Sequence, residues 1–148
     1  MCFVSFFLPF LHGLCVWFGP HTLSGITGHT TTAVVHIEEV EEKGIAHVIE
    51  KARRVIGDSP CYVSFDVDGL DPAFAPGTGT PEVGGLTPRE VQGILQGLAG
   101  AVNVVGGDVM EVAPMYDPST NTALVAAQML FEILSLMALS PGGGRRAA

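Results

Sequence analysis

The sequence predicts an α/β fold built on a parallel sheet. Short β-branched or apolar runs alternate with helical patterns in the order strand, helix, strand, helix, strand, helix. Units of this kind, joined by right-handed crossovers, place their strands in parallel. Hydrophobic residues make up 47% of the 148 residues, which is enough for one domain with a buried core.

The first predicted unit spans residues 33–57. Residues 33–37 read AVVHI, a β-branched run typical of a strand, and a charged stretch, EEVEEKG, follows it. The next apolar residues recur with helical spacing and line one face of an amphipathic helix: Ile45, Val48, Ile49, Ala52, Val55 and Ile56. Gly57 is expected to end this helix.

Two further units follow. Residues 61–67, CYVSFDV, are apolar enough for a strand buried on both faces. The run TPRE at 87–90 is a capping box with proline at the first helical position, and it predicts a helix with Val91, Ile94, Leu95 and Leu98 on its apolar stripe. Residues 101–112 supply a third strand, and residues 119–139 a helix so apolar all round that we expect it to be mostly buried.

Composition limits the classes of partner and the compartment. The formal net charge is −8, with 7 Lys+Arg against 15 Asp+Glu, so the basic patch that binds nucleic acid is missing. Such an acidic field favours metal ions or cationic substrates, or serves solubility alone. Cys2, Cys15 and Cys61 form no CxxC pair, which favours a reducing compartment, the cytosol or the mitochondrion.

The termini differ from the middle of the chain. Residues 1–32 are an apolar start followed by a linker, residues 33–139 form the folded part, and residues 140–148 are a tail that is disordered by composition. The start lacks the basic region of a signal peptide and is short for a membrane span, so we expect no membrane partner. A secretory signal, a segment that docks on a partner surface, and an altered gene start remain open alternatives.

An acidic cluster marks the end of the second predicted strand. Because residues two apart on a strand face the same side, we expect the carboxylates of Asp66 and Asp68 to converge. At ~4 Å and an effective dielectric of ~20, two carboxylates repel by about 4 kcal/mol, so a proton or a cation must offset them. No lysine follows Lys51. The sequence therefore predicts a hard divalent cation such as Mg, Ca or Mn.

Other interpretations of the acidic residues were weighed. An EF-hand loop is excluded, because its sixth and twelfth positions would be Asp71 and Gly77. The stretch also resembles haloacid-dehalogenase-like phosphatases, but Leu70 replaces the threonine of that motif and no downstream lysine exists. Asp71 precedes a proline, which is typical of a turn former.

Five more side chains admit a structural reading. Asp108 orients the strand end or contacts a neighbouring amide. Thr78 and Thr80 either form turns or donate hydrogen bonds near a metal. His36 and His47 are expected to be packed or surface residues rather than ligands.

Residues 64–85, SFDVDGLDPAFAPGTGTPEVGG, closely resemble the signature of the ureohydrolase family, which includes arginases and agmatinases. The resemblance continues through TPREV and GGDVMEVAPMYDPSTNTALVAAQMLFEIL, and the APMYDPSTNTA stretch looks more like agmatinases. It implies a three-layer α/β fold with a parallel sheet and a binuclear Mn²⁺ site. It further implies Asp66 and Asp68 as metal ligands, Glu111 as the residue that binds a cationic guanidino substrate, and agmatine hydrolysis to putrescine and urea.

The sequence also departs from this family. Two upstream metal motifs, G-G-D-H and D-A-H-x-D, do not occur in it, and no catalytic acid or base is identified. We therefore expect the C-terminal part of the fold joined to an unrelated apolar start, with weak manganese binding and little turnover. The alternative is a non-catalytic remnant that binds a cation or intact subunits. Half a sheet exposes an edge and an apolar helix, which predicts pairing with another chain, such as a homo-oligomer, and residues 1–18 are expected to cover part of that surface.

Overall fold

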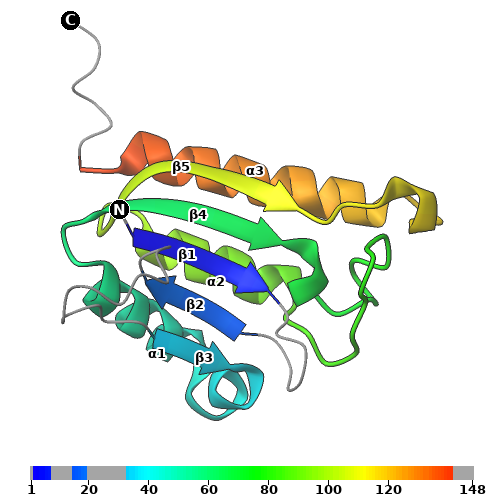
Figure 1. Cartoon of the computed structure of the whole chain (residues 1–148), viewed down its shortest axis with the longest axis horizontal. Coiled ribbons are helices and arrows are strands. Elements are labelled where there is room, and N and C mark those ends of the chain that lie inside the picture. The colour runs from blue at the N-terminus through cyan, green and yellow to red at the C-terminus, as the bar shows by residue number, and fades with distance from the viewer. Residues whose placement is uncertain (1, 8–14, 20–32, 142–148) are drawn as a thin grey trace, which may run out of the picture.

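The computed structural model describes residues 2–7, 15–19 and 33–141, the first two segments by their backbone alone. The described strands form one sheet with the order β3-β2-β1-β4-β5, drawn in Figure 1. The strands are β1 (Cys2–Phe7), β2 (Cys15–Gly19), β3 (Ala33–His36), β4 (Pro60–Asp66) and β5 (Asn103–Met110). The helices are α1 (Ile37–Ile56), α2 (Pro88–Leu98) and α3 (Asn121–Leu139), with 3₁₀ turns η1 (Val67–Gly69) and η2 (Pro114–Tyr116).

The apolar start of the chain lies within the sheet itself. Strand β1 pairs in parallel with β4, with Val4 opposite Val63, and β2 pairs antiparallel with both β1 and β3. Residues 8–14 are too few for the crossover that parallel neighbours need, so β2 runs against the other strands. Strand β1 therefore covers an edge of β4 that would otherwise be open, as expected of residues 1–18, and does so as a strand of the sheet. Of the predicted linker, residues 20–32 lie outside the described part.

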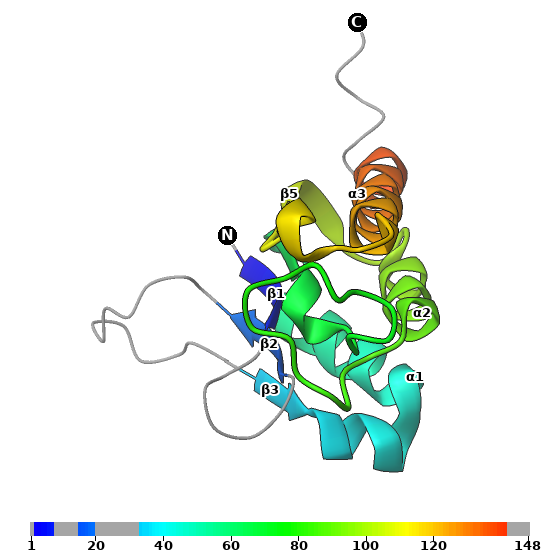
Figure 2. The same ribbon diagram turned by 90° about the vertical axis from the view of Figure 1, so that its right-hand side faces the viewer.

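All three α-helices lie on one face of the sheet, as Figure 2 shows from the side. Along β4, the buried Cys61, Val63 and Phe65 alternate with half-buried residues such as Tyr62 and Ser64. This alternation points the buried set toward the helices and the other set toward the opposite face. The described residues thus form a sheet and one helical layer, two of the three layers that the family resemblance implies.

Helix α1 begins earlier than the sequence predicted. Its first turn starts at Ile37, directly after β3, so the charged stretch before Ile45 is itself helical. Gly44 interrupts the helix with φ 74°, a conformation that glycine adopts without a steric penalty. The predicted end is confirmed, because the backbone N–H of Gly57 donates to the carbonyl of Arg53 at 2.9 Å.

Helix α2 confirms the capping prediction. The backbone N–H of Glu90 donates to the Thr87 hydroxyl at 3.2 Å, and the Thr87 N–H donates to the Glu90 carboxylate at 2.8 Å. The predicted apolar stripe is buried in full. Gly93 and Gly97 let α2 approach α1 closely, since an added Cβ at either glycine would collide with Ile45 or Ile49, respectively.

Helix α3 differs from the prediction that it is mostly buried. One side packs on the core through residues such as Met129 and Ile133, whereas Leu124 and Phe131 on the other side are 72% and 63% exposed. By length and composition alone α3 is also, within the described residues, the one helix that could cross a membrane, and only 33% of the relevant window is buried. The tail begins later than residue 140, since the Ser140 side chain is buried and accepts a bond from Val104 N–H at 2.8 Å.

Candidate functional site

The predicted site residues meet at the carboxyl ends of β4 and β5. These neighbouring strands are parallel, and Asp66, the last residue of β4, lies opposite Met110, the last residue of β5. Glu111 directly follows Met110 and is therefore placed beside Asp66. The crevice beyond the carboxyl ends of parallel strands is where α/β folds bind ligands.

Asp66 and Asp68 are brought together by a turn and not by strand alternation. Strand β4 ends at Asp66, and residues 67–69 form the 3₁₀ turn η1. The carboxylate of Asp66 accepts a hydrogen bond from the backbone N–H of Asp68 at 2.9 Å, which caps that turn. The predicted geometry, two carboxylates on one face of an extended strand, is therefore wrong, although the two residues are close.

Asp68 carries the least satisfied side chain of this cluster. It is only 5% exposed. One carboxylate oxygen accepts a hydrogen bond from the Thr80 hydroxyl, while Oδ1 is buried without a hydrogen-bond partner in the described structure. A buried carboxylate oxygen without a donor costs free energy, and a cation is the partner that such an oxygen lacks.

Asp66 lies in an environment that disfavours its charge. Burial raises the pKa of this carboxyl from its usual 3.8 to about 6. The hydrogen bond from Asp68 N–H opposes the increase, and the nearby negative charges of Asp68 and Glu111 add to it. Proton binding and cation binding therefore compete at Asp66, because each relieves the same unfavourable charge.

Glu111 has a left-handed backbone, with φ 63°. The Thr78 hydroxyl donates to the Glu111 carbonyl at 3.0 Å, and an added Cβ at Gly79 would lie 3.8 Å from a Glu111 carboxylate oxygen. Non-glycine residues adopt this conformation where the surrounding structure holds them. The loop at residues 77–80 thus fixes the backbone from which the Glu111 side chain extends.

The same loop is anchored to α3, a connection that the sequence analysis missed. Gly77 N–H donates to the hydroxyl of the buried Thr122 at 2.8 Å, and Ala113 N–H donates to the Gly77 carbonyl at 2.8 Å. An added Cβ at Gly77 would lie 2.5 Å from the Cβ of Asp117. A glycine between Pro76 and Thr78 signals such a close approach only when the opposing segment is known.

Asp71 and Asp108 are structural in this arrangement. Asp71 accepts hydrogen bonds from Ala73 N–H and Gly84 N–H, each at 2.8 Å, and these bonds lower its pKa, which fits the predicted turn former. Asp108 accepts from Tyr62 Oη at 2.9 Å and Ser64 Oγ at 2.7 Å, two hydroxyls of the neighbouring strand β4, so of its two predicted roles the orientation of the strand end fits better than a contact with an amide. The bond to Asp108 raises the pKa of Tyr62.

The donor chemistry fits a hard divalent cation in part. A bound cation would give the unpaired Oδ1 of Asp68 a partner, and it would offset the unfavourable negative charge of the buried Asp66 carboxylate. Within residues 33–141, however, no three His, Cys, Asp or Glu side chains gather in a way that could hold a metal. Within the described residues, the cluster therefore offers a cation the two carboxylates of Asp66 and Asp68 and no third such group.

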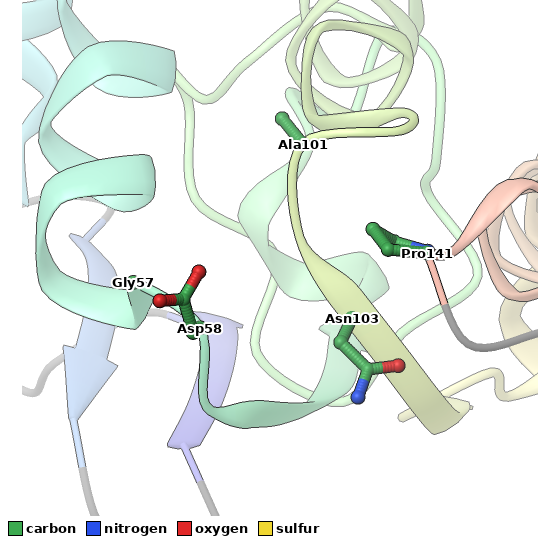
Figure 3. A pocket seen from close by; sticks show the side chains of 5 residues that line it. All are labelled: Gly57, Asp58, Ala101, Asn103 and Pro141. Carbon is green, nitrogen blue, oxygen red and sulfur yellow. The ribbon is translucent and has the colours of Figure 1, made fainter.

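A cavity of about 260 Å³ lies at the other end of the sheet, as Figure 3 shows. Its walls come from Gly57, Asp58, Ala101, Asn103 and Pro141. These residues lie near the starts of β4 and β5, whereas Asp66 and Glu111 lie at their ends. The cavity is therefore separate from the acidic cluster.

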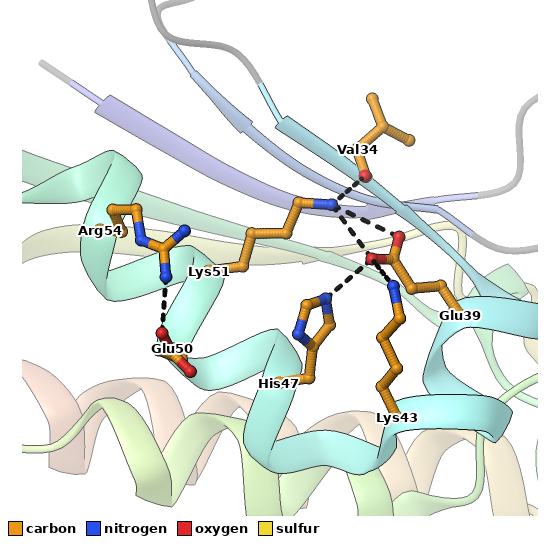
Figure 4. A network of polar contacts seen from close by, with 7 residues as sticks. All are labelled: Val34, Glu39, Lys43, His47, Glu50, Lys51 and Arg54. Carbon is orange, nitrogen blue, oxygen red and sulfur yellow. Dashed lines mark hydrogen bonds and ion pairs between the residues drawn. The ribbon is translucent and has the colours of Figure 1, made fainter.

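A second polar cluster surrounds Glu39 on α1, as Figure 4 shows. Its carboxylate lies 2.7 Å from His47 Nε2, 3.1 Å from Lys43 Nζ and 3.3 Å from Lys51 Nζ. Hydrogen bonds, above all that with His47, lower the pKa of Glu39 from 4.5 to about 2. Lys51 also donates to the Val34 carbonyl at 2.9 Å, so this cluster connects both parts of the interrupted helix to β3. His47 is half-buried and pairs with Glu39, in keeping with the predicted packed or surface residue.

Sequence comparisons connect this chain with guanidine-hydrolysing enzymes by name. It is 55% identical over 107 residues to a guanidinopropionase of Pseudomonas aeruginosa, covering 72% of this chain and 33% of that protein. It is 52% identical over 104 residues to a mitochondrial agmatinase of Gallus gallus, covering 70% and 30%. The chain thus spans about a third of the length of these relatives.

Solved structures agree with the sequence matches. Proclavaminate amidino hydrolase from Streptomyces clavuligerus superposes with a TM-score of 0.68 at 44% identity, covering 70% of this chain and 35% of that one. Arginase from Bacillus caldovelox gives a TM-score of 0.62 at 35% identity, covering 70% and 34%. The family model described as arginase family matches residues 23–135. The chain therefore belongs to the arginase family.

Proposed function

We propose that this chain carries part of a manganese site for the hydrolysis of a guanidino compound, with agmatine as the substrate and urea and putrescine as the products. The observation that supports it most directly is the buried Oδ1 of Asp68, which has no hydrogen-bond partner among the described residues and lies in a cluster with Asp66. The family match and the relatives named agmatinase support the reaction class.

Asp66 and Asp68 would hold the cation, and Glu111 would bind the guanidinium. A bound divalent cation supplies a Lewis acid and a nucleophile at neutral pH. A carboxylate can accept two parallel hydrogen bonds from a guanidinium, and the fixed backbone of Glu111 suits this role. Thr80 would hold the Asp68 carboxylate in place through its hydroxyl.

The charge of the chain favours agmatine over an acid substrate. Agmatine carries a cationic tail, whereas guanidinopropionate carries an anionic one, and the formal net charge of the chain is −8. The phosphatase alternative is abandoned, because the residues that suggested it lie within the arginase-family match. Mitochondrial and cytosolic locations both remain in the proposal, since the relative from Gallus gallus is named mitochondrial.

A titration of the whole chain with Mn²⁺, followed by calorimetry, tests the metal site. We expect weak binding that is lost in Asp66→Ala and Asp68→Asn. Asp58→Asn is the matched control, because Asp58 is an exposed carboxylate near the start of β4 and should leave binding unchanged. Binding that survives both site substitutions would contradict the proposal.

Urea release tests the reaction. With Mn²⁺ in excess we expect little or no turnover of agmatine, because only two ligands are present among the described residues. Stoichiometric, manganese-dependent urea release that Asp66→Ala abolishes would overturn this expectation of weak activity and strengthen the proposed reaction. Trace urea release separates the two candidates: a trace that depends on manganese and is abolished by Asp66→Ala supports the hydrolase. Manganese binding with no detectable urea favours the second candidate, a non-catalytic cation-binding remnant, which the lack of a third ligand among the described residues supports.

A further inference from the structure

Two cysteines occupy neighbouring positions in the sheet, at the end where β1 and β4 begin. Cys2 is the first residue of β1, and its Cα partner in the parallel register is Cys61, the second residue of β4. Paired positions of neighbouring strands belong to the same side of a sheet, because the alternation runs in step along both strands. Cys15, the remaining cysteine of the sequence, lies at the other end of β1, where it pairs with Phe7.

The spacing of paired strand positions suits a disulfide. Neighbouring strands lie about 4.8 Å apart, which falls within the ~4.4–6.8 Å between Cα atoms that disulfides span. Bonds that rise upright from a sheet place Cβ atoms about as far apart as the strands, a little beyond the ~3.5–4.5 Å that a relaxed disulfide prefers. A disulfide at such a position is strained, and strained disulfides are reduced more easily than relaxed ones.

The pair joins two parts of the sheet that β1 connects. In the order β3-β2-β1-β4-β5, the middle strand β1 links β2 and β3 to β4 and β5, as Figure 1 shows. Cys61 is 0% exposed, and its thiol donates weakly to the Tyr62 carbonyl at 3.7 Å. The ends of strands open at far lower cost than their interiors, so a small oxidant can reach Cys2 and then Cys61 while the rest of the sheet stays folded.

We propose that Cys2 and Cys61 form a reversible disulfide that holds β1 against β4 under oxidising conditions. With a small disulfide such as oxidised glutathione, the Cys2 thiolate attacks one sulfur of the oxidant, forms a mixed disulfide and releases one thiol. The Cys61 thiolate then attacks the Cys2 sulfur and releases the second thiol. The two protein thiols thus lose two protons and two electrons, which the oxidant takes up as it becomes two thiols.

The proposed bond responds to the redox state of its surroundings. In the reducing compartment that the cysteine content predicts, the pair stays as two thiols. Because the strained bond is easily reduced, it forms only when the surrounding thiol pool becomes oxidised, and it opens again when that pool recovers.

Mass spectrometry of the whole chain tests the bond. The chain is incubated with oxidised glutathione at low protein concentration without denaturant, the remaining thiols are alkylated, and the product is digested. We expect a chain lighter by two hydrogens, with its one alkylated thiol at Cys15 and with the peptides of Cys2 and Cys61 joined. Reduced glutathione should reverse the link. No link, a link through Cys15, a link between chains, or a product that stops at the glutathione adduct would each overturn the proposal.

Hydrogen exchange and thermal unfolding test whether the bond holds β1 in place. Oxidation should slow the exchange of the β1 amides by roughly tenfold or more, because the strand can no longer separate from β4. It should raise the Tm by roughly 5–10 °C, since the bond closes a loop of about 60 residues in the unfolded chain while strain offsets part of that gain. Cys2→Ala should lose both effects, and Cys15→Ala, the matched control, should keep them. Unchanged exchange and Tm in the cross-linked wild-type chain would contradict the role of the bond in holding β1.

Discussion

The hydroxyl of Thr78 donates a hydrogen bond to the main-chain carbonyl of Glu111 at 3.0 Å. Residues 33 positions apart are thus joined at the point where the backbone of Glu111 turns left-handed, with φ 63°. Thr78 is only 3% exposed, so its hydroxyl is shielded from competing water. The loop after β4 and the segment after β5 therefore behave as one unit around the acidic cluster.

Thr78→Val should lower the free energy of unfolding by about 1–2 kcal/mol, because valine keeps the shape of threonine but cannot donate to Glu111. Urea denaturation monitored by circular dichroism measures the change. Thr78→Ser keeps the hydroxyl and is the control. Equal stabilities of the valine and serine variants would show that the hydrogen bond contributes nothing.

The raised pKa of Asp66 predicts that the chain without metal loses stability as pH rises from about 4 to about 6. In this range the folded state holds a proton that the unfolded state has released, so protonation favours folding. The loss amounts to a few kcal/mol at most, since one pKa unit corresponds to about 1.4 kcal/mol. Asp66→Asn should flatten this part of the profile, measured by urea unfolding at a series of pH values in a metal chelator. An unchanged slope in the variant would assign the pH dependence to other groups.

In the presence of Mn²⁺, the stability of the chain should instead rise with pH. A cation binds the ionised form of Asp66, so Mn²⁺ affinity should fall as pH drops below about 6, where the carboxyl takes up its proton. Calorimetric titrations at pH 5 and pH 7.5 measure the ratio, which should be about tenfold for one competing proton in this range. Affinity that does not depend on pH would place the cation away from Asp66.

Glu39 should contribute the opposite pH dependence. Its pKa is lowered from 4.5 to about 2, so its contribution is complete above about pH 4.5 and is lost as pH falls toward 2. At pH 7, Glu39→Gln should cost about 1 kcal/mol, a modest value because solvent screens the group. Glu50→Gln is the control, since Glu50 pairs with Arg54 while both side chains are at least 70% exposed, and it should change little. Thermal unfolding measures the loss of stability in both variants, and equal losses would contradict the contribution assigned to Glu39.

Gly97→Ala should destabilise the chain by about 1–3 kcal/mol, although alanine favours helices, because its Cβ would overlap Ile49 on α1. Gly93→Ala should cost less, since its Cβ meets only the flexible end of Ile45. A double-mutant cycle with Ile49→Ala measures the coupling between the two positions. The smaller side chain at position 49 leaves room for the added Cβ, so the double variant should lose less stability than the sum of the two single losses. Additive effects of the two substitutions would argue against contact between these residues.

Local sequence signals predicted the parts of the fold that depend on neighbours along the chain. The capping box of Thr87 and Glu90 and the glycine stop at Gly57 are fixed by residues within one helical turn. The placement of Asp66, Asp68 and Glu111 at one edge of the sheet also followed from the order of strands and from the family resemblance. Those predictions needed no knowledge of distant contacts.

Several features that the sequence did not reveal depend on distant contacts. The strand pairing of β1 with β4 joins the start of the chain to its middle, and composition alone described that segment as apolar. The bond from Gly77 to Thr122 spans 45 residues. Helix α3 looked buried because its exposed face is as apolar as its core face, so the pattern could not show which face meets the domain.

The position of β1 has a consequence for synthesis. Strand β1, the middle strand of the sheet, is synthesised before its parallel partner β4, which is complete only once Asp66 has been added. Until then the nascent chain holds a strand with one open, hydrogen-bonding side, which is a substrate for chaperones that bind extended apolar segments. A rigid fusion partner at the amino terminus should therefore hinder closure of the sheet more than the same partner at the carboxyl terminus.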